Sequence, residues 1–256
     1  MNIKKEISES YNNYAGQWST KTDSGDNTAR EYLEKPAMRA RLPDLQGKSV
    51  LAIGCGTGEE CAYFKELGAN KVVGIDISEN LINIAQKNYP DIEFYVMDME
   101  EISLNEKFDF VYSSLVMHYV ESWTKTLQNI SSVTNEGALF LFSTHHPVLW
   151  GAERSRTEDE RTSLLGYKKS KKNQTCEVVG DYLTTRKIND VWFDNFPISY
   201  FHRSLESCVL DILQSSFQIV DFAEPKAIKE VVEKDITFYQ IREKIPLFMI
   251  FALRKK

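Results

Sequence analysis

Three glycines fall within five positions directly after a run of strand-forming residues, and no other feature constrains the fold as strongly. The segment, residues 48–64, reads KSVLAIGCGTGEECAYF. Val50, Leu51 and Ile53 are the apolar residues that a strand buried on both faces requires, and residues 59–67 have the pattern of a helix. A glycine-rich turn between strand and helix lets a ligand approach backbone N–H groups at the positive end of the helix. The segment therefore predicts a buried strand followed by a ligand site.

Strand-like and helix-like segments alternate through the middle of the chain. Strands are expected at residues 50–53, 72–76, 93–97, 108–113 and 138–142, and helices at 59–67, 79–88 and 123–133. The pattern resumes later with a helix at 205–213, a strand at 218–222 and a last strand within 245–256. Such alternation is typical of a parallel sheet covered by helices, and right-handed crossovers favour a doubly wound topology. The fold class expected is α/β.

The length of 256 residues fits one α/β domain with additions, so we expect a single domain over residues 1–256. Residues 1–45 are polar, with an aromatic cluster and a helix expected at 29–42, and are expected to cover an edge of the sheet. Residues 148–200 interrupt the alternation with a charged stretch, followed by two short strands around a turn within 177–193. An interruption of this length usually indicates a functional cap or a flexible excursion.

Composition disfavours several classes of protein. The net charge of −6 opposes binding to nucleic acid or to an anionic membrane, and the basic run KKSKK at 168–172 is expected to be a solvated loop. The four cysteines lack metal-ligand spacing and are expected to be reduced, as in a cytoplasmic protein. No apolar run approaches the ~20 residues that span a bilayer. We expect a cytoplasmic protein with no metal; the oligomeric state is left open.

The spacing of the glycines argues against a dinucleotide site. Gly54, Gly56 and Gly58 form G-x-G-x-G, whereas the dinucleotide fingerprint requires glycine where this chain has Glu59. An acidic side chain there would repel a pyrophosphate, but not a ligand that has no phosphate. Two acidic residues also follow strands. Asp76 can accept both hydroxyls of a ribose, and Asp98 can accept from an adenine amino group. An adenosine without phosphate is therefore favoured.

With these motifs the chain resembles the class I S-adenosylmethionine-dependent methyltransferases, in particular their small-molecule branch. The resemblance rests on VLAIGCGTG, GIDIS, VMDME and FDFVYSSLVMHYV, in this order and each at a strand end, and it is weakest over 151–195. It implies a seven-stranded, mostly parallel Rossmann-like sheet with an antiparallel final strand. The implied cofactor is S-adenosylmethionine, with S-adenosylhomocysteine as product. One departure is Ala52, where the family usually has an acidic residue near the amino end of the cofactor.

The resemblance also implies a set of cofactor-binding residues at the strand ends and in the N-terminal segment. The methionine portion is surrounded by Gly54, Cys55, Gly56 and Gly58. Asp76 holds the ribose, and Ile77 beside it also binds the cofactor. The adenine is flanked by Asp98 and Met99, the cofactor is lined after the fourth strand by Ser114 and Leu115, and it is closed over by Tyr14 and Trp18.

Three histidines are candidates for a role in transfer. Methyl transfer from a sulfonium is an in-line displacement, so a base is needed only when the methyl acceptor must lose a proton. His118 follows the fourth strand, and His145 and His146 end the fifth. Each could take a proton or orient the methyl acceptor, and each could equally be a packed residue.

Aromatic residues near the return from the interruption could form the pocket for the methyl acceptor. Trp192, Tyr200 and His202 are the candidates, although such residues equally form a small core under a long loop. The expected function is methylation of oxygen or nitrogen of a small molecule. An NAD-dependent oxidoreductase is disfavoured by Glu59, and a cofactor-binding module without transfer activity is suggested only by Ala52.

Overall fold

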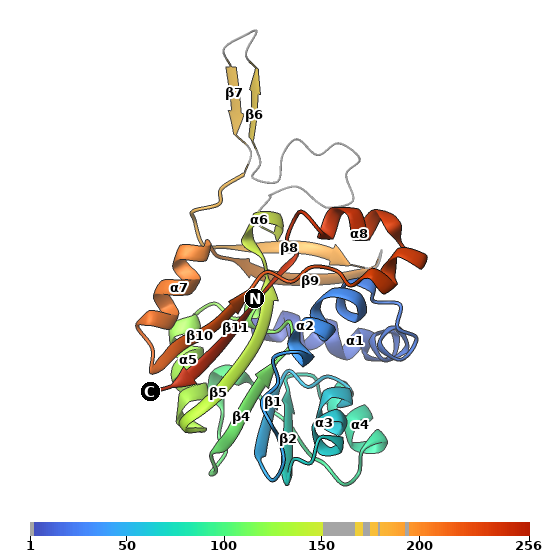
Figure 1. The fold of residues 1–256 in the computed structure, drawn as a ribbon, viewed down its shortest axis with the longest axis vertical. Helices are drawn as coiled ribbons and strands as arrows, with labels where there is room; N and C mark the ends of the chain where they lie inside the picture. The colour runs from blue at the N-terminus through green and yellow to red at the C-terminus, as the bar shows by residue number, and fades with distance from the viewer. Residues whose placement is uncertain (1–2, 151–166, 171–174, 179, 193–194) are drawn as a thin grey trace.

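A computed structural model describes residues 3–150, 167–170, 175–178, 180–192 and 195–256. A seven-stranded sheet forms its centre, in the order β10-β11-β5-β4-β1-β2-β3 (Figure 1). The strands are β1 (Ser49–Ile53), β2 (Lys71–Asp76), β3 (Glu93–Val96), β4 (Phe108–Ser113), β5 (Thr134–His145), β10 (Phe217–Ala223) and β11 (Phe248–Lys255). The first five are parallel to one another, whereas β11 runs antiparallel to β5 and β10. The predicted doubly wound α/β sheet with an antiparallel last strand is confirmed.

Both faces of the sheet are buried by helices, which explains why β1 is apolar at successive positions. Val50 and Ala52 face a core that includes α2 (Lys35–Arg39), α3 (Glu59–Glu66) and α4 (Glu79–Asn88), while Leu51 and Ile53 face the opposite core. That second core includes α5 (Trp123–Ser132) and α7 (Leu205–Leu213). In Figure 1, α5 and α7 lie on one side of the sheet, and α3 and α4 lie on the other. The two cores anchor the strand ends that carry the candidate site.

The N-terminal segment differs from its expected structure. A helix that we did not predict, α1 (Ile3–Asp23), comes first. The helix expected at 29–42 is present as a continuous helical run that contains a five-residue π-helix (Arg30–Glu34) followed directly by α2, and it ends at Arg39. The Asn12 side chain ties α1 to the start of α4, because its Oδ1 accepts from Ser78 Oγ at 2.8 Å and from Asn80 N at 3.1 Å. These tertiary contacts hold α1, whose own sequence is only weakly amphipathic.

Two short strands around a turn are expected within 177–193, and two strands do reach into this range, but they pair with other strands and not with each other. The structure pairs β6 (Tyr167–Ser170) with β7 (Thr175–Val178), and β8 (Arg186–Trp192) with β9 (Phe196–His202). β9 was not predicted, although Phe196, Ile198 and Tyr200 alternate along the chain as in a half-buried strand. These three residues are buried in a third core against α1. Residues 151–166, the charged part of the expected cap, lie outside the described residues.

Short helices and turns complete the described part of the chain: α6 (Pro147–Trp150), α8 (Ile236–Arg242), and 3₁₀ turns at Met99–Glu101, Met117–Tyr119 and Lys229–Glu233. Within the described ranges, no helix is long and apolar enough to cross a membrane. The same ranges contain no group of three or more side chains arranged to hold a metal ion.

Candidate active site

The strand order places the candidate residues in a row along the carboxyl edge of the sheet. Asp98 follows β3, Asp76 ends β2, Gly54 follows β1, Ser114 follows β4, and His145 ends β5. A cavity of about 450 Å³ runs along this edge and is lined by all five residues. Open α/β sheets bind ligands where the strand order reverses, which here is between β1 and β4. The fold thus brings residues spread over a large part of the sequence to one cavity.

The glycine turn needs glycine for its conformation and for close packing. Gly54, Gly56 and Gly58 all have positive φ, at 66°, 55° and 88°. A Cβ at Gly54 would lie 2.2 Å from a methyl carbon of Val116, whereas at Gly56 the nearest side-chain atom would be Trp18 Nε1 at 3.9 Å. Gly56 therefore presents bare backbone to the cavity, and Gly58 supports the turn at the start of α3 without lining the cavity.

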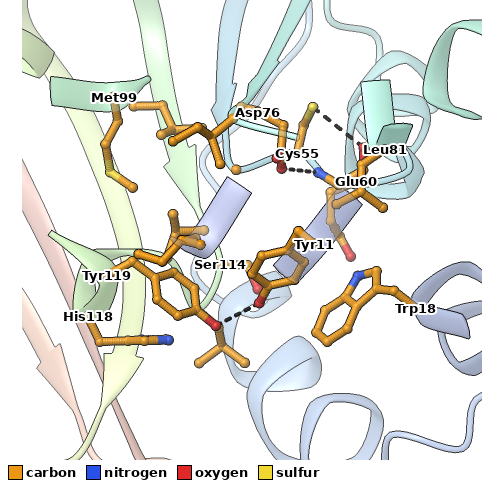
Figure 2. A pocket seen from close by; sticks show the side chains of 18 of the residues that line it. Tyr11, Trp18, Cys55, Glu60, Asp76, Leu81, Met99, Ser114, His118 and Tyr119 are labelled. Atoms are coloured by element: carbon orange, nitrogen blue, oxygen red, sulfur yellow. Dashed lines mark hydrogen bonds between the residues drawn. The ribbon is translucent and has the colours of Figure 1, made fainter. Parts of the chain in front are cut away.

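Asp76 is held rigidly at the end of β2. Its Oδ2 accepts from the backbone N–H of Gly56 at 2.9 Å (Figure 2). Its Oδ1 accepts from the backbone N–H of Ser78, also at 2.9 Å. Burial raises the pKa of this carboxyl group, and the backbone hydrogen bonds oppose the rise. Each oxygen retains acceptor capacity toward the cavity, as a group that binds two vicinal hydroxyls requires.

Asp98 has a partner that the sequence did not reveal. Its Oδ1 accepts from the backbone N–H of Glu100 at 2.8 Å, and Lys4 Nζ lies 2.6 Å from its Oδ2. Lys4 comes from α1, so the N-terminal helix reaches the far end of the cavity. Met99 lies beside it and also lines the cavity.

A cluster of charged side chains that the sequence did not reveal borders the cavity beside the glycine turn. Arg30 contacts three carboxylates, those of Glu31 at 2.7 Å, Glu59 at 3.0 Å and Glu60 at 3.2 Å. Arg30, Glu59 and Glu60 line the cavity, as does Ala52. The two glutamates are visible next to the glycines in the sequence, whereas nothing local indicates that Arg30 reaches them.

Two buried histidines form the opposite end of the cavity. The rings of His118 and His145 stack with centroids 3.5 Å apart. Burial lowers the pKa of His118 to about 3, so its imidazole is neutral at physiological pH. Its Nε2 has no hydrogen-bond partner within the described part of the chain. Nearby, the hydroxyls of Tyr11 and Tyr119 lie 2.6 Å apart and share a hydrogen bond.

The structure does not bring every predicted residue to the cavity lining. Trp18, Cys55, Ile77, Ser114, Leu115 and Trp192 line it, in addition to those described above. Besides Gly58, four predicted residues do not line it. Tyr14 donates to the carbonyl of Asn195, and His146 contacts Glu224 at 2.7 Å. Tyr200 donates to Asp190 at 3.2 Å, and His202 donates to the carbonyl of Tyr182 at 2.8 Å. Tyr200 nevertheless packs edge-on against His145, with ring centroids 5.0 Å apart.

Comparison with known proteins identifies the class that this fold and cavity define. The sequence profile of a methyltransferase domain family matches residues 26–196, so the chain belongs to that family. A protein of Haemophilus influenzae of no described function is 31% identical over 204 residues, which cover 76% of this chain and 77% of its own length.

Solved structures agree with this assignment. An S-adenosylmethionine-dependent methyltransferase from Mesorhizobium loti is similar with a TM-score of 0.72 and 26% identity, over 90% of this chain and 99% of its own. A protein from Listeria monocytogenes assigned to the same enzyme class has the same TM-score and identity, over 87% of this chain and 96% of its own. The chain is thus an S-adenosylmethionine-dependent methyltransferase.

The cavity is chemically suited to S-adenosylmethionine. The buried Asp76 carboxylate matches a ribose, and the bare backbone at Gly56 permits close approach of the ligand. A carboxylate oxygen of Glu60 is buried without a hydrogen-bond partner among the described residues, as expected for a site that receives a cationic group.

Proposed function

We propose that this enzyme transfers a methyl group from S-adenosylmethionine to an oxygen or nitrogen atom of an uncharged small molecule that binds beside His118 and His145. The observation that carries the proposal is the continuity of the cavity. It runs from Asp98 and Asp76 past the glycine turn to the two histidines, so that a cofactor and a second molecule can meet within it.

The cofactor would occupy the part of the cavity beneath α1. In the proposed arrangement Asp76 binds the ribose hydroxyls, and Asp98 and Met99 flank the adenine. The backbone of Gly54, Cys55 and Gly56 surrounds the methionine portion. Ile77, Ser114, Leu115 and Trp18 complete the walls. Residues 1–45 and 148–200 would act as covers, because α1 and Trp192 both contribute to the lining.

The histidine end of the cavity is suited to an uncharged methyl acceptor. Among the described residues that line this end are Leu115, His118, Val120, His145, Trp192 and Phe248, and no lysine, arginine, aspartate or glutamate is among them. A carboxylate or phosphate would lose its hydration there without gaining a charged partner. The aromatic walls favour a flat or apolar molecule instead.

In the proposed arrangement His118 orients the methyl acceptor. When bound, the cofactor supplies an electrophilic methyl group on its sulfonium. A neutral imidazole whose pKa is about 3 holds a proton poorly, so His118 Nε2 would accept a hydrogen bond from the hydroxyl or amine of the substrate rather than store its proton. His145 supports the ring of His118 by stacking, and the two rings exclude water from this end of the cavity.

Labelled S-adenosylmethionine tests the proposal. We expect label transfer to members of a panel of uncharged phenols, alcohols and amines, and little transfer to matched carboxylates and phosphate esters. Replacing His118 with Ala should lower turnover by roughly 10–10⁴-fold while leaving S-adenosylhomocysteine affinity near that of wild type, because the side chain acts on the methyl acceptor.

His146→Ala is the matched control, since His146 lies off the cavity lining, and it should keep turnover within a few-fold of wild type. Cofactor binding without transfer to any acceptor would instead indicate a binding module. Oxidation or reduction of a nicotinamide without methyl release would indicate an oxidoreductase.

A further inference from the structure

The cavity lacks an acidic side chain on β1, although it receives one from α3. Ala52 contributes only a methyl group to the wall beside the glycine turn. Glu60 lies in the first turn of α3, lines the same part of the cavity, and has a side chain that is only 9% exposed. In Figure 2 its carboxylate points across the cavity toward Trp18. An acidic group therefore reaches this end from a different element.

The two oxygens of Glu60 have different surroundings. Both arginine contacts fall on Oε1, with Arg30 Nη2 at 3.2 Å and Arg39 Nη2 at 3.3 Å. Oε2 is buried and has no hydrogen-bond partner in the described part of the protein. A buried carboxylate oxygen without a donor is costly, since it has lost water and gained nothing in return. The arrangement therefore suits a ligand that brings a donor to Oε2.

The local balance of charge disfavours an anionic ligand beside Glu60. Arg30, Lys35 and Arg39 are already in contact with the carboxylates of Glu31, Glu59 and Glu60. A further carboxyl group, Glu34, is buried nearby and accepts hydrogen bonds from Ser114 Oγ at 2.8 Å and Ser143 Oγ at 2.6 Å. The cluster thus offers no excess of positive charge to attract an anion.

Glu59 is the natural contrast within this cluster. It also lines the cavity, but its side chain is 33% exposed, and Lys35 and Arg30 contact its two different oxygens. Glu59 Oε2 is also buried without a hydrogen-bond partner among the described residues, but Arg30 Nη2 lies 3.0 Å from it, so each oxygen of Glu59 has a cation in contact. Glu60 Oε2 has no such cation contact in the described part of the chain.

We propose that Glu60 Oε2 accepts a hydrogen bond from the α-ammonium group of the cofactor and thereby supplies the acidic contact that Ala52 cannot. Arg30 and Arg39 act as positioning residues that hold Oε1 and so aim Oε2 at the cavity. The inference rests on the proposed function, because it assumes that the methionine portion of the cofactor lies beside the glycine turn.

Calorimetry with two nucleosides tests the contact. One ligand is S-adenosylhomocysteine, and the other is its deaminated analogue, which has hydrogen in place of the ammonium group. Wild type should bind S-adenosylhomocysteine about 10- to 100-fold more tightly than the analogue, the range for a hydrogen bond between charged groups. Glu60→Gln should lose most of this preference, whereas Glu59→Gln should keep it.

Each alternative outcome is informative. Equal affinity of wild type for the two nucleosides would overturn the inference and leave the proposed function standing, and this measurement does not depend on whether a variant folds. Equal loss of preference in Glu59→Gln and Glu60→Gln would overturn it too, because the charge of the cluster would then matter rather than Oε2. If wild type binds neither nucleoside, the cofactor site itself is wrong, and the proposed function fails with it.

Discussion

The imidazole rings of His118 and His145 stack face to face, with centroids 3.5 Å apart and planes within 8° of parallel. His118 lies in the 3₁₀ turn Met117–Tyr119 and His145 is the last residue of β5, so the contact joins two neighbouring strand ends. Two charged rings at this distance would repel each other strongly. The two rings therefore do not both carry a charge, and burial keeps His118 neutral at physiological pH.

The stability of the protein should depend on pH through His118. Its pKa is about 3 in the folded state and near 6.5 in an unfolded chain, so the unfolded state binds more protons between these values. Stability must then fall as pH falls below about 6.5, and this residue should remove about 2 kcal/mol between pH 7 and pH 5. Urea unfolding of wild type and His118→Gln at both pH values measures the difference.

In His118→Gln the loss of stability between pH 7 and pH 5 should be smaller by that amount, whatever its stability at pH 7. His202→Gln serves as the comparison and should show a smaller change: burial lowers the pKa of His202 as well, but the hydrogen bond to the carbonyl of Tyr182 opposes that shift. Identical acid sensitivity in wild type and His118→Gln would contradict a neutral, buried His118.

Substitution of Gly54 should be costly because both its conformation and its surroundings exclude a side chain. The φ of 66° is unfavourable for alanine, and the new Cβ would lie 2.2 Å from Val116 Cγ2. Gly54→Ala should lower the free energy of unfolding by roughly 2–4 kcal/mol.

Gly16→Ala is the control for this substitution. Gly16 lies within α1, and a Cβ added there would have no neighbour within 4 Å. Alanine should therefore be neutral or stabilise the protein by ~0.5–1 kcal/mol. Equal stability of both variants in urea unfolding would refute this account of the turn.

Removal of the Asp76 carboxylate should weaken cofactor binding. Asp76→Ala is expected to reduce the free energy of S-adenosylhomocysteine binding by roughly 1.5–3 kcal/mol, since it removes hydrogen bonds to a charged group. Asp109→Ala is a matched control, because Asp109 lies at the opposite end of the sheet and accepts from Ser49 N and Oγ. Calorimetry on the folded variants measures their affinity for S-adenosylhomocysteine. Unchanged affinity in Asp76→Ala would reject the assignment of Asp76 to the ribose.

The N-terminal helix should gain protection when the cofactor binds. α1 contributes Lys4, Ile7, Tyr11 and Trp18 to the cavity lining and is fastened to α4 through Asn12. A ligand beneath it would add contacts, so hydrogen exchange in residues 3–23 should slow on addition of S-adenosylhomocysteine.

The buried helix α5 provides the internal reference for that experiment and should change little. Asn12→Ala should raise exchange in α1 without ligand, since it removes the acceptor for Ser78 Oγ and Asn80 N. Equal protection of α1 with and without ligand would argue that the helix is a static part of the fold.

Much of the fold could be predicted because its signals are local. The apolar residues of β1, the glycine turn and the helix after it are adjacent in the sequence, and a buried parallel strand requires this composition. The positions of Asp76 and Asp98 after their strands follow from the same pattern. Parallel strands end at one edge of a sheet, so the sequence alone also predicted that a ligand would lie there.

Tertiary structure decided the contacts between segments that are distant in the sequence. Lys4 meets Asp98, Arg30 meets Glu60, and His118 meets His145, yet no periodicity or spacing relates the members of each pair. Local pattern determined which strands form and where they end, since backbone pairing and apolar periodicity act over short stretches. Which charges and rings face one another depended on the packing of whole elements, because burial and electrostatic interaction act between residues that only the folded chain brings together.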